Sequence, residues 1–138
     1  IGMIDKKSNY IILDFGTATT FDVVIKDKYL GGIIAPGVNL SLKTLISKAS
    51  LIPSVNLSKI SKVVGTNTDS AVKSGFYWGY LGLIDNIIKL IIKQTRKPFK
   101  IILTGGLAHL FKNRIKGKIE IKKDLTINGL LKVAKNLK

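Results

Sequence analysis

The sequence contains no cysteine, and this absence disfavours several classes of protein. A chain of 138 residues without Cys has no disulfide framework and no thiolate nucleophile. Its single histidine, His109, is more typical of a structural residue than of a zinc site. The lack of Cys is also consistent with a reducing compartment, and we expect a cytoplasmic location.

Acidic residues are scarce. Eight Asp and Glu stand against 23 Lys and Arg, which gives a formal net charge of +15. Only two of the basic residues are Arg, and the Lys residues are spread from Lys6 to Lys138. A nucleic-acid site would cluster its charge and favour Arg. We therefore favour a solvated Lys surface around an Ile-rich core over a nucleic-acid partner, although the charge would steer anionic ligands towards the protein.

Long hydrophobic runs are absent as well. No apolar stretch reaches the ~18 residues of a membrane span, because Asp85, Asn86 and Lys89 interrupt the best candidate. Residues 1–10 do not follow the signal-peptide pattern, because their lysines come after the apolar residues. Hydrophobic residues nevertheless make up 46% of the chain, which excludes a disordered tail. With no repeat and no linker, we expect one domain.

Periodicity predicts a chain of mixed strands and helices. β-branched and aromatic runs predict strands at residues 10–14, 19–25, 29–34, 99–103 and 118–121. Helical spacing and capping residues predict helices at residues 38–50, 66–94, shortly after 106, and 126–137. The second and third strands should form a hairpin across Lys26–Lys28. The predicted order is βββ-α-α-β-α-β-α, an α/β fold in which a meander feeds a mixed sheet.

The sharpest motif is the run Asp-Phe-Gly-Thr-Ala-Thr-Thr that begins at Asp14. A carboxylate at the end of an apolar strand needs a cationic or hydrogen-bonded partner. Gly16 would let a ligand approach the backbone, and Thr17, Thr19 and Thr20 offer hydroxyls at the following turn. The residues fit a corner where phosphate or a metal meets the chain. They fit an ordinary hairpin with an Asx-type turn equally well.

Glycines mark two further places. Thr104-Gly-Gly-Leu-Ala108 joins a predicted strand to a predicted helix. The two glycines either simply end the strand or form a turn that presents backbone N–H groups to an anion or an adenosine. Gly75, Gly79 and Gly82 share one face of the long helix, where each costs about 1 kcal/mol relative to Ala. They predict close packing against another backbone, either in a second subunit or in the same chain. Asp85, in the same helix, should face solvent.

Read in order, these motifs resemble the C-terminal half of the type III pantothenate kinase family over residues 10–131. The blocks begin at Asp14, Gly31, Ile52, Val64, Thr104 and Asp124. The resemblance implies an actin-like, ribonuclease-H-like ATPase lobe that spans residues 1–138. It also implies ATP-dependent phosphorylation of pantothenate to 4'-phosphopantothenate, the first step of coenzyme A biosynthesis. Family members use Mg²⁺ and a monovalent cation, K⁺ or NH₄⁺, and work as homodimers.

The resemblance also implies roles by position. Asp14 resembles the family's monovalent-cation ligand, and Thr17, with Gly16 beside it, resembles the residue that contacts ATP phosphate. Thr68 resembles the threonine that contacts pantothenate, although it could also be the N-cap of the long helix. Gly105–Gly106 would line the adenosine side, and the glycine face that includes Gly75 would lie near the dimer interface.

The departures from the family concern catalysis. The family begins with another lobe that carries an Asp-x-Gly-Asn motif, and its general base is the Asp of a Gly-x-Asp-Arg segment before the strand that ends at Asp14. Residues 1–10 hold Asp5 but no Arg, and Asp5 lies too close to Asp14 for that role. We expect no catalytic residue here, a general base upstream of Ile1, and a fragment that needs a missing N-terminal lobe, in frame or as a separate chain. The alternative is a non-catalytic binding or regulatory module associated with nucleic acid.

Overall fold

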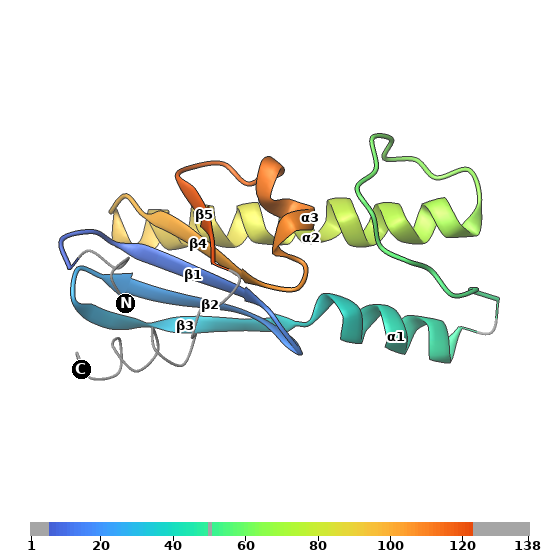
Figure 1. The fold of residues 1–138 in the computed structure, drawn as a ribbon, viewed down its shortest axis with the longest axis horizontal. Coiled ribbons are helices and arrows are strands. Elements are labelled where there is room, and N and C mark those ends of the chain that lie inside the picture. The colour runs from blue at the N-terminus through green and yellow to red at the C-terminus, as the bar shows by residue number, and fades with distance from the viewer. Residues whose placement is uncertain (1–5, 50, 123–138) are drawn as a thin grey trace.

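The computed structural model describes residues 6–49 and 51–122, and its centre is a five-stranded sheet (Figure 1). The strands are β1 (Tyr10–Phe15), β2 (Ala18–Ile25), β3 (Lys28–Pro36), β4 (Lys100–Gly105) and β5 (Ile119–Ile121). The helices are α1 (Val38–Lys48), α2 (Thr68–Thr95), α3 (Ala108–Phe111) and the short 3₁₀ turn η1 (Lys112–Arg114). The predicted helix at 126–137, the block that begins at Asp124, and Asp5 lie outside the described residues.

The sheet is mixed, with strand order β3-β2-β1-β4-β5. The first three strands form the predicted antiparallel meander, whereas β4 runs parallel to β1 and β5 runs parallel to β4. The predicted hairpin turn is tight, and Lys26 adopts a left-handed φ of 56° in it. The α/β class is therefore confirmed. Because β1 and β4 are parallel neighbours, the turns that follow them meet at one edge of the sheet.

Helix α2 covers one face of the sheet and extends beyond it, alongside α1 (Figure 1). Its buried residues recur every three or four positions, at Ser74, Tyr77, Leu81, Ile84, Ile88 and Ile91. All of these except Ser74 pack against Ile11, Leu13 and Phe15, the alternate residues of β1 that point to this face. Each fully buried side chain of this kind stabilises the fold by about 1.5–3 kcal/mol. Ala71, which is exposed, and Trp78, which is half-buried, are not among these buried residues.

One of the two alternatives for the glycines of α2, and the prediction for Asp85, are wrong. Gly75, Gly79 and Gly82 are exposed, and a Cβ at any of them would meet nothing within 4 Å. The alternative of packing within one chain is therefore excluded among the described residues. Asp85 does not face open solvent but is half-buried. Burial raises the pKa of its carboxyl, and the nearby charges of Lys116 and Lys89 oppose that rise.

The link between β3 and α1 generates a test of the fold. Gly37 is the N-cap of α1, and its carbonyl oxygen accepts a hydrogen bond from the Ser41 N–H at 2.9 Å. A Cβ on Gly37 would overlap the carbonyl of Thr17 and lie 2.9 Å from that of Gly16. Both neighbours are backbone, so they cannot rotate away.

We expect Gly37→Ala to lower the free energy of unfolding by about 2–4 kcal/mol, the range of severe packing faults. Denaturant titration measures this change. Gly106→Ala is the matched control, because a Cβ there meets nothing within 4 Å and should change stability by less than about 0.5 kcal/mol. Equal stability of the two variants would contradict the close approach at Gly37.

Candidate functional site

Three turns meet at one edge of the sheet, and this corner is the candidate site. They are the turns that follow β1, β3 and β4. The parallel register pairs Asp14 with Thr104 and Phe15 with Gly105, so the residues after Asp14 lie beside the Gly105–Gly106 turn. Antiparallel pairing of β1 and β2 places Thr20 opposite Asp14 on the other side. Residues that are 90 apart in sequence are thereby brought into one short strip of backbone.

Glycines make the corner possible. Gly105 has a φ of +97°, and a Cβ there would lie 2.5 Å from the carbonyl oxygen of Phe15. Gly37 presses against the Gly16–Thr17 turn from the β3 side. The Gly16 N–H donates to the Ala18 carbonyl at 3.1 Å and closes that turn. The exposed residues left at the edge are the predicted ones, Gly16, Thr17, Gly105 and Gly106.

One of the three threonine hydroxyls predicted at the turn forms a hydrogen bond within the fold. Thr19 is completely buried, and its Oγ1 donates to the Pro36 carbonyl at 3.0 Å. It therefore ties β2 to the end of β3 and cannot reach a ligand. Thr17 is exposed, and Thr20 is half-buried on the face that carries Asp14.

Asp14 is a half-buried carboxylate at the tip of β1. Burial raises the pKa of its carboxyl, and the charge of Asp22 raises it further. Among residues 6–49 and 51–122, the ion pairs are Lys73–Asp69 and Lys122–Glu120, and neither involves Asp14. The carboxylate thus lies where a bound cation would relieve both the burial and the repulsion from its neighbour.

Asp22 is a part of this site that sequence reasoning missed. It pairs with Ile12 across β1 and β2, so its side chain shares the sheet face of Asp14. The Tyr29 hydroxyl donates to Asp22 Oδ1 at 2.9 Å. Burial and this hydrogen bond raise the pKa of Tyr29. The period-two spacing of strand residues could have placed Asp22 on this face, although nothing in the sequence indicated its tyrosine partner.

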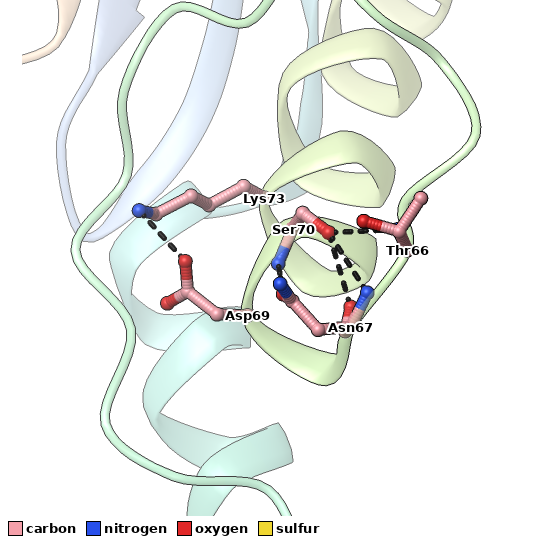
Figure 2. A network of polar contacts seen from close by, with 5 residues as sticks. All are labelled: Thr66, Asn67, Asp69, Ser70 and Lys73. Atoms are coloured by element: carbon pink, nitrogen blue, oxygen red, sulfur yellow. Dashed lines mark hydrogen bonds and ion pairs between the residues drawn. The ribbon is translucent and has the colours of Figure 1, made fainter.

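Thr68 is not the N-cap of α2. Figure 2 shows that Asn67 caps the helix, because its side-chain oxygen accepts from the Ser70 N–H at 2.8 Å. The Ser70 hydroxyl completes the capping box by accepting from the backbone N–H groups of Asn67 at 3.2 Å and Thr66 at 3.0 Å. An ion pair of 2.9 Å joins Asp69 to Lys73 one turn on. Thr68 is therefore the first helical residue and has no capping role.

Thr68 instead lies at a mainly apolar groove of about 570 Å³ between α1 and α2. The lining residues are Ser41, Leu45, Ile52, Thr68, Ala71, Val72, Gly75, Phe76 and Tyr80. Thr68 and Tyr80 lie twelve positions apart in α2, roughly 18 Å along the axis. The Tyr80 hydroxyl contacts the carbonyls of Pro36 at 3.2 Å and Gly37 at 3.4 Å. Tyr80 thus links the groove to the sheet-edge corner, whereas Thr68 stands apart from that corner.

A resident metal cage is not visible in the described part of the chain, where no three His, Asp or Glu side chains gather closely enough to hold an ion. His109 is exposed and belongs to no such group. Within the same residues, no helix combines the length and apolar character that crossing a membrane requires.

Comparison with known proteins gives one consistent result. A model of the type III pantothenate kinase family matches residues 1–90. The chain belongs to this family. It is 60% identical over all 138 residues to the type III pantothenate kinase of Pelagibacter ubique and covers 56% of that protein. Against the enzyme of Cereibacter sphaeroides it is 48% identical over 124 residues, 89% of this chain and 48% of the relative. The chain thus spans about half the length of these relatives.

Solved structures support the fold. A conserved Baf family protein from Campylobacter jejuni aligns with 94% of this chain and 58% of its own, at a TM-score of 0.55 and 26% identity. The Alp12 filament structure aligns with 95% of this chain and 48% of its own, at a TM-score of 0.60 and 20% identity. The second likeness shows the fold alone.

The raised pKa of Asp14 gives a pH-dependent prediction. The folded chain holds this proton more tightly than the unfolded chain, whose carboxyl titrates near 3.8. Stability should therefore fall as the pH rises from about 3.8 through the folded pKa. We expect Asp14→Asn to have a higher Tm than the parent chain at pH 7, with a gap that closes as the pH approaches 3.8.

Thermal melts across pH measure this gap. Asp27→Asn, which removes an exposed carboxylate from the β2–β3 turn, is the control for lost charge and should not reproduce it. Asp85 contributes to the parent chain and to Asp14→Asn alike, so its effect cancels in the comparison. A lower Tm for Asp14→Asn at pH 7 would show that the carboxylate is stabilised in the fold by a partner.

Proposed function

We propose that this chain is one lobe of a two-lobed pantothenate kinase and works with a second lobe to transfer the γ-phosphoryl group of ATP to pantothenate. The observation that carries the proposal is the 60% identity to the Pelagibacter ubique enzyme over the full chain. The relatives are about twice as long, so the complete activity belongs to the longer protein. The product would be 4'-phosphopantothenate, which enters coenzyme A biosynthesis in the cytoplasm.

The lobe is proposed to have the actin-like, ribonuclease-H-like ATPase fold. The antiparallel meander of β1–β3, followed by parallel β4 and β5, supports this assignment. In such a lobe, ligands bind at the carboxyl ends of the parallel strands. That edge is where the exposed glycines and Thr17 lie.

ATP is proposed to lie along this edge. Thr17 would offer its hydroxyl and backbone N–H to the phosphates, and Gly16 would let them approach the chain. The Gly105–Gly106 turn would face the adenosine, because its backbone is exposed and free of side chains. The formal charge of +15 would draw the anionic nucleotide towards the lobe.

The Asp14 carboxylate suits a monovalent cation, K⁺ or NH₄⁺. It is half-buried, lies near a second carboxylate, and has no ion pair among the described residues. A cation there would supply positive charge beside the phosphates. Mg²⁺ would accompany ATP, held mainly by phosphate oxygens.

The groove between α1 and α2 suits the other substrate. Pantothenate has a branched apolar centre with polar groups at either end, and the groove is apolar with hydroxyls from Thr68, Ser41 and Tyr80. Thr68 would contact pantothenate from the start of α2. Tyr80 is a further candidate, because its hydroxyl already bonds to Ser41 Oγ at 3.1 Å.

The reaction is an in-line attack of the pantothenate hydroxyl on the γ-phosphorus. Catalysis of this kind rests on positioning and on neutralising charge. A carboxylate that accepts the hydroxyl proton is proposed to come from a Gly-x-Asp-Arg segment upstream of Ile1. This lobe would supply the cation, phosphate and pantothenate contacts.

A homodimer is also proposed, with the exposed glycine face of α2 against a second copy. Gly75, Gly79 and Gly82 leave the helix surface open for close approach by another backbone. We expect Gly79→Leu to shift the assembled two-lobe protein from dimer to monomer in sedimentation velocity, whereas Lys43→Gln on α1 should not. A Gly79→Leu protein that stays dimeric would place the interface elsewhere.

The kinase proposal is tested by exchanging a segment between two proteins. The matching segment of the Pelagibacter ubique kinase is replaced by this chain, and ADP release is followed with and without pantothenate. We expect pantothenate-dependent turnover. Thr17→Val in the chimera should lower kcat/KM by roughly ten-fold or more, as expected when a hydrogen bond to charged phosphate is lost.

Two controls make the result interpretable. Thr44→Val in the chimera removes an exposed α1 hydroxyl that bonds only within its helix, at 2.8 Å to the Leu40 carbonyl, and should leave turnover within about two-fold. Circular dichroism confirms folding of each variant. A folded chimera without turnover, or one in which Thr17→Val has no effect, would count against the proposal.

A further inference from the structure

A second pocket lies across α2 from the glycine face and is separate from the sheet-edge corner. It has a volume of about 500 Å³ and is lined by Lys59, Ile60, Ser61, Tyr77, Asn113 and Arg114. We call it the Arg114 pocket. Three stacked rings lie between it and the end of β1: Phe15 packs on Phe111 with centroids 5.2 Å apart, and Phe111 packs on Tyr77 at 5.9 Å.

The walls of the Arg114 pocket are held in place. The loop wall is fixed to α2, because Trp78 Nε1 donates to the Lys62 carbonyl at 3.3 Å and the Ser74 hydroxyl donates to the Val63 carbonyl. The opposite wall is η1, and its Arg114 guanidinium lies 5.4 Å from the centroid of the Trp78 ring. A cation over an aromatic face in this way is attracted to it. The guanidinium is thus positioned before any ligand arrives.

The charge of the pocket is one-sided. Its lining includes two cations, Lys59 and Arg114, and no carboxylate. Neither cation takes part in an ion pair among the residues that the structure describes. Ser61 and Asn113 add a hydroxyl and an amide, while Tyr77 and Ile60 supply an apolar floor. Arg binds phosphate through two parallel hydrogen bonds, and a nearby Lys adds a point charge.

We propose that the Arg114 pocket binds a phosphorylated small molecule, with its phosphate between Arg114 and Lys59 and an apolar or planar part against Tyr77 and Ile60. The volume is in the range of small-molecule sites. This site goes beyond the proposed kinase reaction and uses none of its residues. It offers the protein a second place to sense a phosphate ester.

The chain carries its own reporter for this proposal. Trp78 is the single tryptophan, and the Arg114 guanidinium lies 5.4 Å from the centroid of its ring. The probe is phenyl phosphate, which combines the anion with a planar group, titrated into the 138-residue chain while Trp78 fluorescence is recorded. We expect a saturable change that sodium chloride at matched ionic strength does not produce. Methyl phosphate, which lacks the ring, should bind more weakly.

Variants locate the binding. Lys59→Gln leaves the Arg114–Trp78 contact intact, so the reporter is unchanged, and it should weaken phenyl phosphate binding by roughly ten-fold or more, as the loss of a charged contact does. Arg114→Gln, followed by calorimetry because it alters the reporter, should weaken binding at least as much. Lys43→Gln on α1 and Thr17→Val at the sheet edge should leave the affinity within about two-fold.

Several outcomes would overturn the proposal. They are a response that never saturates, a response that salt alone reproduces, and a Lys59→Gln chain that binds as tightly as the parent. Thr17→Val weakening the affinity as much as Lys59→Gln would place the ligand at the sheet edge instead. If Arg114→Gln fails to fold by circular dichroism, Lys59→Gln alone decides, because its side chain is exposed on a loop.

Discussion

The parallel pairing of β1 with β4 is the constraint on which the candidate site depends. These strands are 90 residues apart at matched positions, Tyr10 beside Lys100. Parallel neighbours need a long crossover, and here the crossover contains β2, β3, α1 and the 28 residues of α2. The register sets Phe15 opposite Gly105, and a Cβ on Gly105 would already overlap the Phe15 backbone. The turn after β4 is therefore close enough to share a ligand with the turn after β1.

Different sides of helix α2 contribute to different candidate sites. Successive residues of an α-helix are about 100° apart, so Phe76, Tyr77 and Gly79 point in different directions. Phe76 lines the groove beside α1, Tyr77 lies between the core and the Arg114 pocket, and Gly79 is open to the outside. The helix can do this because Leu81, Ile84, Ile88 and Ile91 hold its second half on the sheet. Its first half is then free to form the walls of two pockets.

Local patterns in the sequence were enough to predict most elements and the corner itself. The β-branched runs predicted the meander, and Asp14, Gly16, Thr17 and the Gly105–Gly106 turn do lie together at one edge. One cause of the misses is that contacts over long sequence separations override local signals. Thr19 is buried by a bond to Pro36, 17 residues away.

The same reason hid other members of the sites. The hydroxyl of Tyr80 reaches backbone 43 and 44 residues away, and Arg114 meets Trp78 only after the chain has returned through β4. The cap of α2 was missed for a local reason instead: Asn67 and Thr68 are both plausible caps by residue type, and only the hydrogen bond between Asn67 and Ser70, three residues apart, distinguishes them. Residue type was thus enough to predict which functional groups lie at the corner. The residues that hydrogen-bond to those groups and orient them could be identified only from the fold.

Asp14 forms no ion pair with a Lys or Arg in the described part of the chain, although the protein is strongly basic. The protein has 23 basic residues, so the lack of an ion pair at Asp14 does not follow from a shortage of cations. A Lys or Arg there would neutralise the carboxylate permanently and would occupy the space beside Gly16 and Thr17. A bound monovalent ion supplies the same charge in a smaller volume and can share its coordination with phosphate oxygens. The second carboxylate, Asp22, strengthens the argument, because it raises the local negative charge that such an ion would offset. An acidic corner on a strongly basic chain therefore supports the proposed site for a cation together with an anionic nucleotide.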